Sequence, residues 1–236
     1  MPTELIVALD VPSADAIKPL LRQLPSEVNF FKVGLELFIR DGVRAMELLA
    51  QEQKRVFLDL KLHDIPHTVA QAIKSASRFE AALMTVHAAG GRAMLSAAAE
   101  AAAECPVRPQ LIAVTTLTSL NEKDFADLGI QRTLAEQALA LGTMVLECRI
   151  DGLVTSVLEA PTLRSHFGPK PILVTPGIRP TGANVGDQKR IATPTVAIRA
   201  GASYLVVGRP ILDAPKPGLA AAAILAEMAE AQGNVQ

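Results

Sequence analysis

Three charged residues stand close together where an apolar run ends, in Val56-Phe-Leu-Asp59-Leu-Lys61-Leu-His-Asp64-Ile-Pro66. Side chains alternate faces along an extended strand, so Asp59 and Lys61 are expected to point the same way. A carboxylate and an ammonium at the end of a buried strand are costly unless they meet partners or a substrate. Asp64 comes just past the predicted strand, where Pro66 suits the first turn of a helix. The segment therefore predicts either an ion pair that closes a strand or a set of catalytic charges.

This segment is the third of eight short apolar runs that alternate with helical patterns. The eight predicted strands are 5–9, 29–33, 55–60, 82–86, 110–114, 150–154, 171–174 and 203–207. The predicted helices include one that Ser13 could cap, with apolar residues from 17 to 24, and others at about 42–53, 69–76, 91–104, 122–127, 133–147, 193–201 and 218–231. Eight strands separated by helices, with no linker or change of composition, predict one (β/α)₈ TIM barrel over residues 1–236. A doubly wound open sheet is the alternative fold.

Polar residues collect where the predicted strands end. Active sites of (β/α)₈ barrels form at the carboxyl ends of the strands, so these side chains are expected to converge. The convergence favours a functional over a structural interpretation of the Asp59 and Lys61 charges. The residues concerned are Asp10, Lys32, Asp59, Lys61, Thr118, Arg179 and Arg209.

The last two strands are followed by segments that suit a phosphate group. Gly208-Arg209 follows the eighth strand, and a long loop with three glycines follows the seventh. In this fold the loops after strands seven and eight often bind phosphate. Backbone N–H groups at glycine and a fixed guanidinium suit a phosphate dianion, and Gln188, late in the loop, could donate to it. The alternative is an ordinary turn with a surface arginine.

Composition excludes several classes of protein. The chain has 236 residues, of which 50% are hydrophobic and 20% charged, enough for a sizeable core and no sign of disorder. A net charge of −1 and only 3% aromatic residues argue against nucleic-acid binding. Two cysteines are too few for a disulfide framework. With no signal peptide and no apolar stretch of membrane-spanning length, we expect a soluble, cytoplasmic protein without a membrane partner.

The full set of motifs resembles the orotidine 5′-monophosphate decarboxylase family. The Asp-x-Lys pair alone is weak, because related sugar-phosphate decarboxylases and synthases carry it too. The resemblance covers nearly the whole chain, from Asp10 to Arg209. The matching motifs are Asp59-x-Lys61-x-x-Asp64-Ile-Pro66, Lys32, Leu117-Thr118-Ser119, Pro176-Gly-Ile-Arg179-Pro and Val207-Gly-Arg209-Pro-Ile211.

The resemblance implies decarboxylation of orotidine 5′-monophosphate to uridine 5′-monophosphate, without cofactor or metal. It also implies a homodimer in which Asp64 and Thr68 reach into the partner's site. The implied catalytic quartet is Lys32, Asp59, Lys61 and the partner's Asp64, with Lys61 stabilising and protonating a carbanion at C6. The remaining implied substrate contacts are Asp10, Lys32 and the partner's Thr68 at the ribose, Thr118 at the pyrimidine, and Pro176, Arg179, Gln188, Gly208 and Arg209 around the phosphate.

Two other functions stay open on the residues. A metal-dependent sugar-phosphate lyase on the same barrel would need carboxylates such as Asp10, Asp59 and Asp64 to hold a divalent ion, with Lys61 competing against it. A non-catalytic barrel that binds a phosphorylated ligand would need Arg209 but not the lysine–aspartate set. A zinc site at His63 and His67 is not expected, because no third ligand is evident.

Overall fold

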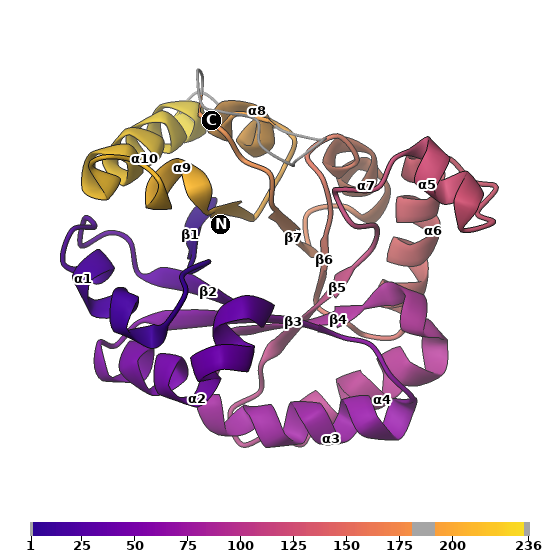
Figure 1. Ribbon diagram of the computed structural model, residues 1–236. Coiled ribbons are helices and arrows are strands. Elements are labelled where there is room, and N and C mark those ends of the chain that lie inside the picture. Colours follow the sequence, from indigo (N-terminus) through magenta and orange to yellow (C-terminus); the bar gives the residue numbers. More distant parts are fainter. Residues whose placement is uncertain (1, 181–191, 234–236) are drawn as a thin grey trace.

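The computed structural model describes residues 2–180 and 192–233, and its eight strands form a closed parallel barrel (Figure 1). Neighbouring strands pair in chain order, and β8 returns to pair with β1 through Glu4–Tyr204 and Val7–Val207. The predicted barrel is thus confirmed and the open sheet is wrong. The strands are β1 Glu4–Ala8, β2 Phe30–Gly34, β3 Arg55–Leu62, β4 Leu83–His87, β5 Gln110–Val114, β6 Gly152–Val154, β7 Ile172–Thr175 and β8 Tyr204–Val207.

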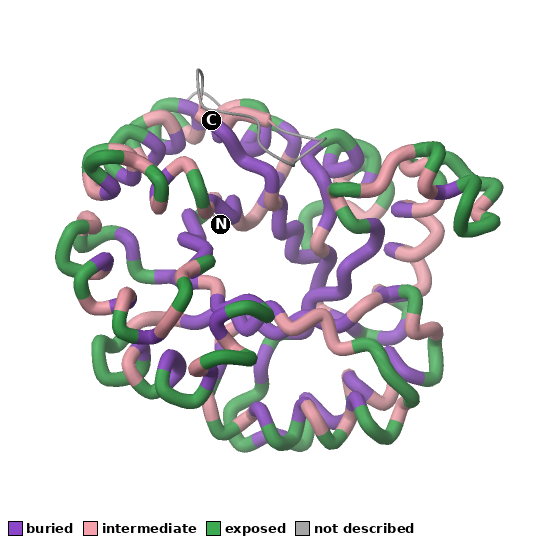
Figure 2. The backbone as a smooth tube through the Cα atoms, viewed as in Figure 1, coloured by how far each residue is buried: buried purple, intermediate pink, exposed green. Residues whose placement is uncertain are grey.

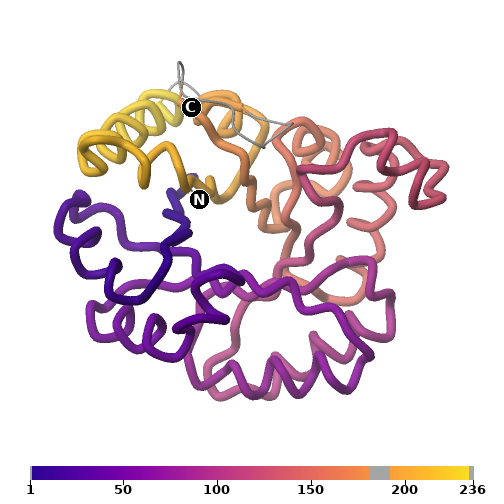
Figure 3. Tube along the Cα trace, viewed as in Figure 1, coloured from indigo at the N-terminus to yellow at the C-terminus, as the bar shows by residue number. Residues whose placement is uncertain are grey.

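Helices cover the outside of the barrel, and the chain travels once around it from β1 to β8 (Figure 3). The α-helices are α1 Ile17–Leu21, α2 Leu35–Gln51, α3 Pro66–Ala76, α4 Gly91–Ala103, α5 Glu122–Asp127, α6 Leu134–Glu147, α7 Ala160–Phe167, α8 Pro194–Arg199, α9 Arg209–Leu212 and α10 Pro217–Gly233. Short 3₁₀ turns are η1 Ala14–Ala16, η2 Ser77–Phe79 and η3 Ala88–Gly90.

The alternation of side chains along the strands divides the core in two. In β1, Ile6 and Ala8 belong to the cluster inside the barrel, whereas Leu5 and Val7 belong to the larger cluster between strands and helices. Parallel strands in this fold are buried on both faces, which explains why they appear in the sequence as continuous apolar runs. Figure 2 shows the buried strands enclosed by helices whose outer faces are exposed.

The first two helices differ from their prediction. Helix α2 begins at Leu35, seven residues before the predicted start, and contains a non-helical residue at Asp41, with φ −138° and ψ 29°. The Asp41 carboxylate accepts the Ala14 backbone N–H at 3.0 Å. Ser13 was predicted to cap the helix that follows it, but its side chain makes no capping hydrogen bond to η1. The carboxylate of Asp41, 27 residues along the chain, therefore caps the backbone N–H of Ala14, where the sequence predicted a cap by the neighbouring Ser13.

Helix α7 had no predicted range, and β6 begins at Gly152 rather than 150. The guanidinium of Arg164 ties α7 to the bottom of the barrel. It donates to the carbonyl oxygens of Gly168 and Pro171 at 2.9 Å and of Gly201 at 2.7 Å. This contact set joins segments over 30 residues apart, which a local pattern cannot show.

Among residues 2–180 and 192–233, no helix has the length and apolar content needed to cross a bilayer.

Candidate active site

The described residues enclose a cavity of about 240 Å³ at the carboxyl ends of the strands. Nine of the residues singled out in the sequence line it, drawn from six of the eight strands or the segments that follow them. They are Asp10, Lys32, Asp59, Lys61, Thr118, Pro176, Arg179, Gly208 and Arg209.

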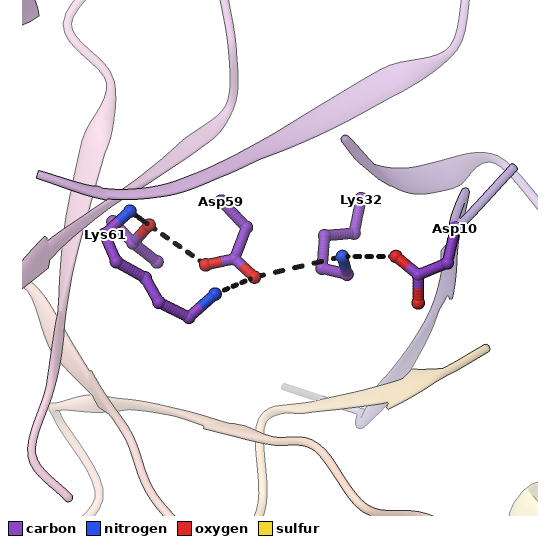
Figure 4. A network of polar contacts seen from close by, with 5 residues as sticks. Asp10, Lys32, Asp59 and Lys61 are labelled. Carbon is purple, nitrogen blue, oxygen red and sulfur yellow. Dashed lines mark hydrogen bonds and ion pairs between the residues drawn. The ribbon is translucent and has the colours of Figure 1, made fainter. Parts of the chain in front are cut away.

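Four charged side chains form a row of alternating sign along one wall (Figure 4). Lys32 Nζ lies 3.0 Å from Asp10 Oδ1 and 3.9 Å from Asp59 Oδ2. Lys61 Nζ lies 2.8 Å from the same Asp59 oxygen. Asp59 and Lys32 are largely buried, with side chains 11% and 12% exposed, whereas Asp10 is half exposed. Two ammonium groups thus hold one buried carboxylate.

Strand β3 brings Asp59 and Lys61 together by an irregularity rather than by simple alternation. Leu58 pairs with Met84 and Leu62 pairs with Val86, so three residues of β3 lie opposite a single residue of β4. Lys61 adopts a left-handed backbone conformation with φ 51°. A non-glycine residue in this region costs of order 1–3 kcal/mol, and such strain clusters at functional sites. The expected contact is present, but its backbone is not that of a regular strand.

The single β4 residue opposite this bulge is Thr85, which is 1% exposed. Its Oγ1 accepts the backbone N–H of Lys61 at 2.8 Å and donates to Asp59 Oδ1 at 3.0 Å. Sequence reasoning missed Thr85. The available signal was a lone hydroxyl residue inside the apolar run 82–86.

Gly34, at the end of β2, leaves room for the Lys32 ammonium. A Cβ at Gly34 would lie 2.6 Å from Lys32 Nζ and 3.7 Å from Asp10 Oδ1. The backbone there has φ −99°, which any residue adopts, so the requirement for glycine comes from this close approach. Gly34 is a second residue that the sequence did not identify.

Two arginines line the cavity from the segments that follow β7 and β8. Arg179 is 7% exposed, its Nη1 donates to the carbonyl of Ile178, and its backbone N–H donates to Ala192 at 2.9 Å. Arg209 opens α9 and is exposed, with Gly208 before it. Two guanidinium groups on one cavity suit a dianionic ligand.

Among the described residues, two of the predicted site residues, Asp64 and Thr68, are not part of this cavity lining. Asp64 and Thr68 are exposed, and the Asp64 carboxylate accepts the backbone N–H of Ile65 at 2.6 Å. Gln188 lies outside the described residues. The deeper wall of the cavity is apolar, another feature that the sequence did not reveal; it is formed by Ala8, Phe57, Val154, Val174 and Val206.

Two histidines stack beside the charged row. The rings of His63 and His87 lie 5.2 Å apart at 16°, and His87 Nδ1 accepts the backbone N–H of Ala89 at 3.2 Å. Burial, followed by the positive potential of His63 and Lys61, lowers the pKa of His87. In the described part of the chain, no three His, Cys, Asp or Glu residues gather in a way that could hold a metal ion.

Comparisons with known proteins point to one family. Residues 3–224 match the model of the "Orotidine 5'-phosphate decarboxylase / HUMPS family". An orotidine 5′-phosphate decarboxylase of Nostoc sp. is 51% identical over 223 residues, covering 92% of this chain and 93% of that protein. One from Nitrosococcus oceani is 46% identical, covering 96% and 97%. The crystal structure of orotidine 5′-phosphate decarboxylase from Lactobacillus acidophilus superposes with a TM-score of 0.83 at 37% identity, covering 96% of this chain and 99% of that one.

Proposed function

The chain belongs to the orotidine 5′-phosphate decarboxylase / HUMPS family, and we propose that it decarboxylates orotidine 5′-monophosphate to uridine 5′-monophosphate in pyrimidine nucleotide synthesis. The observation that carries the proposal is the row Asp10, Lys32, Asp59 and Lys61 inside a cavity that also contains two arginines. The row suits a reaction that develops negative charge at carbon, and the arginines suit a nucleotide monophosphate.

In the proposed mechanism Lys61 provides the electrophilic stabilisation. The bond from C6 of the pyrimidine to the carboxylate carbon breaks, CO₂ leaves, and the electron pair remains on C6. An ammonium placed beside C6 before the reaction stabilises this charge as it forms, which is commonly the largest catalytic effect. At about 4 Å and an effective dielectric of about 20, the attraction is on the order of 4 kcal/mol. Lys61 then transfers a proton to C6 as general acid, and solvent reprotonates its amine.

We assign to Asp59 the task of holding Lys61. The 2.8 Å contact to Lys61 Nζ and the hydrogen bond from Thr85 fix the carboxylate from two sides, which supports positioning. Repulsion between Asp59 and the substrate carboxylate in the ground state is the other role considered, and the two differ in their effect on binding. An Asp59→Asn variant that binds substrate more tightly than wild type would favour repulsion.

The other residues of the site bind the substrate. Asp10 and Lys32 would take the ribose hydroxyls, together with Thr68 from a second copy, and Thr118 would contact the pyrimidine edge. The phosphate site would comprise Pro176, Arg179, Gln188, Gly208 and Arg209. Binding energy at the phosphate, far from C6, can be used to organise the reacting end.

We further propose that the active form is a homodimer. Asp64 and Thr68 are exposed and lie outside the cavity of their own chain, as residues that serve a second copy would. An apolar stripe on α2, formed by Leu35, Ile39 and Val43 at a spacing of four residues, is exposed by 49%, 80% and 47%. Exposed apolar residues gathered on one helix face are typical of an interface.

The metal-dependent lyase is the less favoured activity. Lys32 lies between Asp10 and Asp59, and its ammonium occupies the place that a cation would need between those two carboxylates. A binding protein without catalysis would have no use for a strained lysine paired with a buried carboxylate. These observations support the decarboxylase over both alternatives.

The decisive experiment measures orotidine 5′-monophosphate turnover by purified protein in excess EDTA, for wild type, Lys61→Ala and the exposed control Lys123→Ala. We expect turnover by wild type and by the control, and its loss in Lys61→Ala. Turnover that disappears in EDTA and returns with magnesium would contradict the metal-free mechanism. A Lys61→Ala protein as active as wild type would exclude Lys61 from the chemistry.

The shared site is tested by mixing inactive subunits. Lys61→Ala and Asp64→Ala proteins, each inactive alone, should regain activity after subunit exchange, because one site of each hybrid dimer has both residues intact. If exchange is complete and no activity returns, Asp64 does not serve the partner's site.

A further inference from the structure

The hydroxyl of Thr85 connects the two charged residues at the centre of the site. It touches the backbone of Lys61 and the side chain of Asp59, at 2.8 and 3.0 Å. Thr85 is on β4 while both partners are on β3, so the contacts join neighbouring strands where regular pairing between Leu58 and Leu62 is interrupted. The hydroxyl therefore replaces part of the backbone ladder.

The direction of both hydrogen bonds is fixed by chemistry. A hydroxyl has one proton, an ionised carboxylate only accepts, and a backbone N–H only donates. Thr85 must give its proton to Asp59 Oδ1 and accept from Lys61 N. The other Asp59 oxygen then remains for the ammonium of Lys61, at 2.8 Å. Each oxygen of the carboxylate thus has its own partner, and the plane of the carboxylate is set.

We propose that Thr85 is a positioning residue that holds Asp59 and the left-handed backbone of Lys61 in the arrangement needed for proton delivery. The inference rests on the proposed decarboxylation, since it concerns the same lysine. The strained backbone of Lys61 persists only if its surroundings hold it. Thr85 is the single residue of β4 facing the three bulged residues of β3, and its hydroxyl contacts the first and the last of them.

Loss of this hydroxyl should affect the reaction more than the binding of the nucleotide. The arginines that would bind the phosphate lie away from β4, because Arg179 follows β7 and Arg209 begins α9 after β8. Without the hydroxyl, Asp59 Oδ1 loses its donor, the N–H of Lys61 loses its acceptor, and the ammonium is free to drift. The expected signature is a lower kcat with KM little changed.

The test compares Thr85→Val, which keeps the shape but removes the hydroxyl, with Thr85→Ser, which keeps the hydroxyl. A matched control is Thr175→Val, since Thr175 is also a buried strand residue, but its hydroxyl donates to the backbone carbonyl of Tyr204. We expect kcat to fall about 10- to 100-fold in Thr85→Val, as for a lost hydrogen bond to a charged group or a misplaced catalytic group. Thr85→Ser should recover most of this loss. Equal kcat values for Thr85→Val and Thr175→Val would overturn the proposal.

A second readout does not depend on activity. Hydrogen exchange of the Lys61 backbone amide, followed by NMR, should be faster in Thr85→Val than in wild type, Thr85→Ser or Thr175→Val. Unchanged protection in Thr85→Val would overturn the proposal even if kcat falls, because the loss would then have another cause. If wild type itself does not decarboxylate orotidine 5′-monophosphate, the proposed function fails, while the exchange data still decide whether Thr85 holds Lys61.

Discussion

Replacing Gly34 with alanine should disturb the charged row while leaving the fold intact. The new methyl group would stand 2.6 Å from Lys32 Nζ, whereas real Cβ contacts essentially never fall below 3.0 Å and rarely below 3.4 Å. The ammonium must therefore move by 0.4 to 0.8 Å, the differences between these distances. Because the atom that moves is the end of a flexible side chain, the backbone can stay in place.

The cost of that movement follows from the distances in the site. If the 3.9 Å separation between Lys32 Nζ and Asp59 Oδ2 grows by 0.8 Å, their attraction falls by about 0.7 kcal/mol at an effective dielectric of about 20. This amount alone corresponds to a factor of about three in rate. Misplacement of a catalytic group by about 1 Å can cost up to about 100-fold. We therefore expect kcat/KM to fall between about 3- and 100-fold.

The unfolding free energy of Gly34→Ala should rise slightly or stay unchanged, even though its kcat/KM falls. At a backbone angle that alanine adopts without strain, Gly→Ala stabilises by about 0.4–1 kcal/mol, because the unfolded chain has less freedom to lose. A suitable control is Gly233→Ala, where a Cβ would meet nothing within 4 Å. Decarboxylation rates and chemical unfolding of both variants would be measured side by side.

A double-mutant cycle can refute this reasoning. If Gly34→Ala acts only by displacing the Lys32 ammonium, it should have no further effect on kcat/KM or on the affinity for uridine 5′-monophosphate in a Lys32→Ala background. An equal loss in the presence and absence of Lys32 would show that the methyl group acts through the backbone or through another side chain.

Three further outcomes follow from residues that are not members of the charged row. Burial lowers the pKa of His87, so below about pH 6.5 the unfolded chain binds more protons than the native one. The unfolding free energy measured in urea should therefore fall between pH 7 and pH 5. In His87→Asn it should fall less steeply. Arg164→Met leaves carbonyl groups without their donor and should lower the unfolding free energy by at least about 2 kcal/mol, with kcat of the folded protein unchanged. Ile39→Asp should give a monomer in analytical ultracentrifugation with greatly reduced turnover; a fully active monomer would contradict the shared site.

Much of the fold and of the site could be predicted because the signals are local. Strands that are buried on both faces appear in the sequence as continuous apolar runs. In a parallel barrel the carboxyl ends of all strands lie at the same end of the barrel. The order of the runs therefore placed Asp10, Lys32 and Arg209 around one cavity. The start of α2 was missed because its kink at Asp41 depends on a contact with Ala14, which is distant in sequence.

The fine geometry of the site could not be predicted for the same reason. The segment Asp59-Leu60-Lys61 alternates charged and apolar residues as a regular strand does, and no residue in it indicates a bulge. The irregularity exists because the hydroxyl of Thr85, 24 residues beyond Lys61, completes the hydrogen bonding. Gly34 acts by the space that it leaves, and this too is visible only when the neighbouring strand is in place.

The left-handed backbone of Lys61 also bears on how the site could be lost in evolution. At an ordinary strand position, glycine is less stable than alanine by roughly 0.5–1 kcal/mol. At φ 51° glycine should instead be more stable than alanine. Glycine has no Cβ and adopts this backbone conformation without strain, whereas alanine would carry the same backbone strain as the lysine. If a mutation replaced Lys61, selection for folding alone would favour glycine at this position. Because glycine is the most stable residue at this backbone conformation, a later change from glycine back to lysine would lower the stability of the fold more than a change from alanine would. Under the proposed mechanism, selection for turnover keeps the lysine at this position, whereas the left-handed backbone disfavours it.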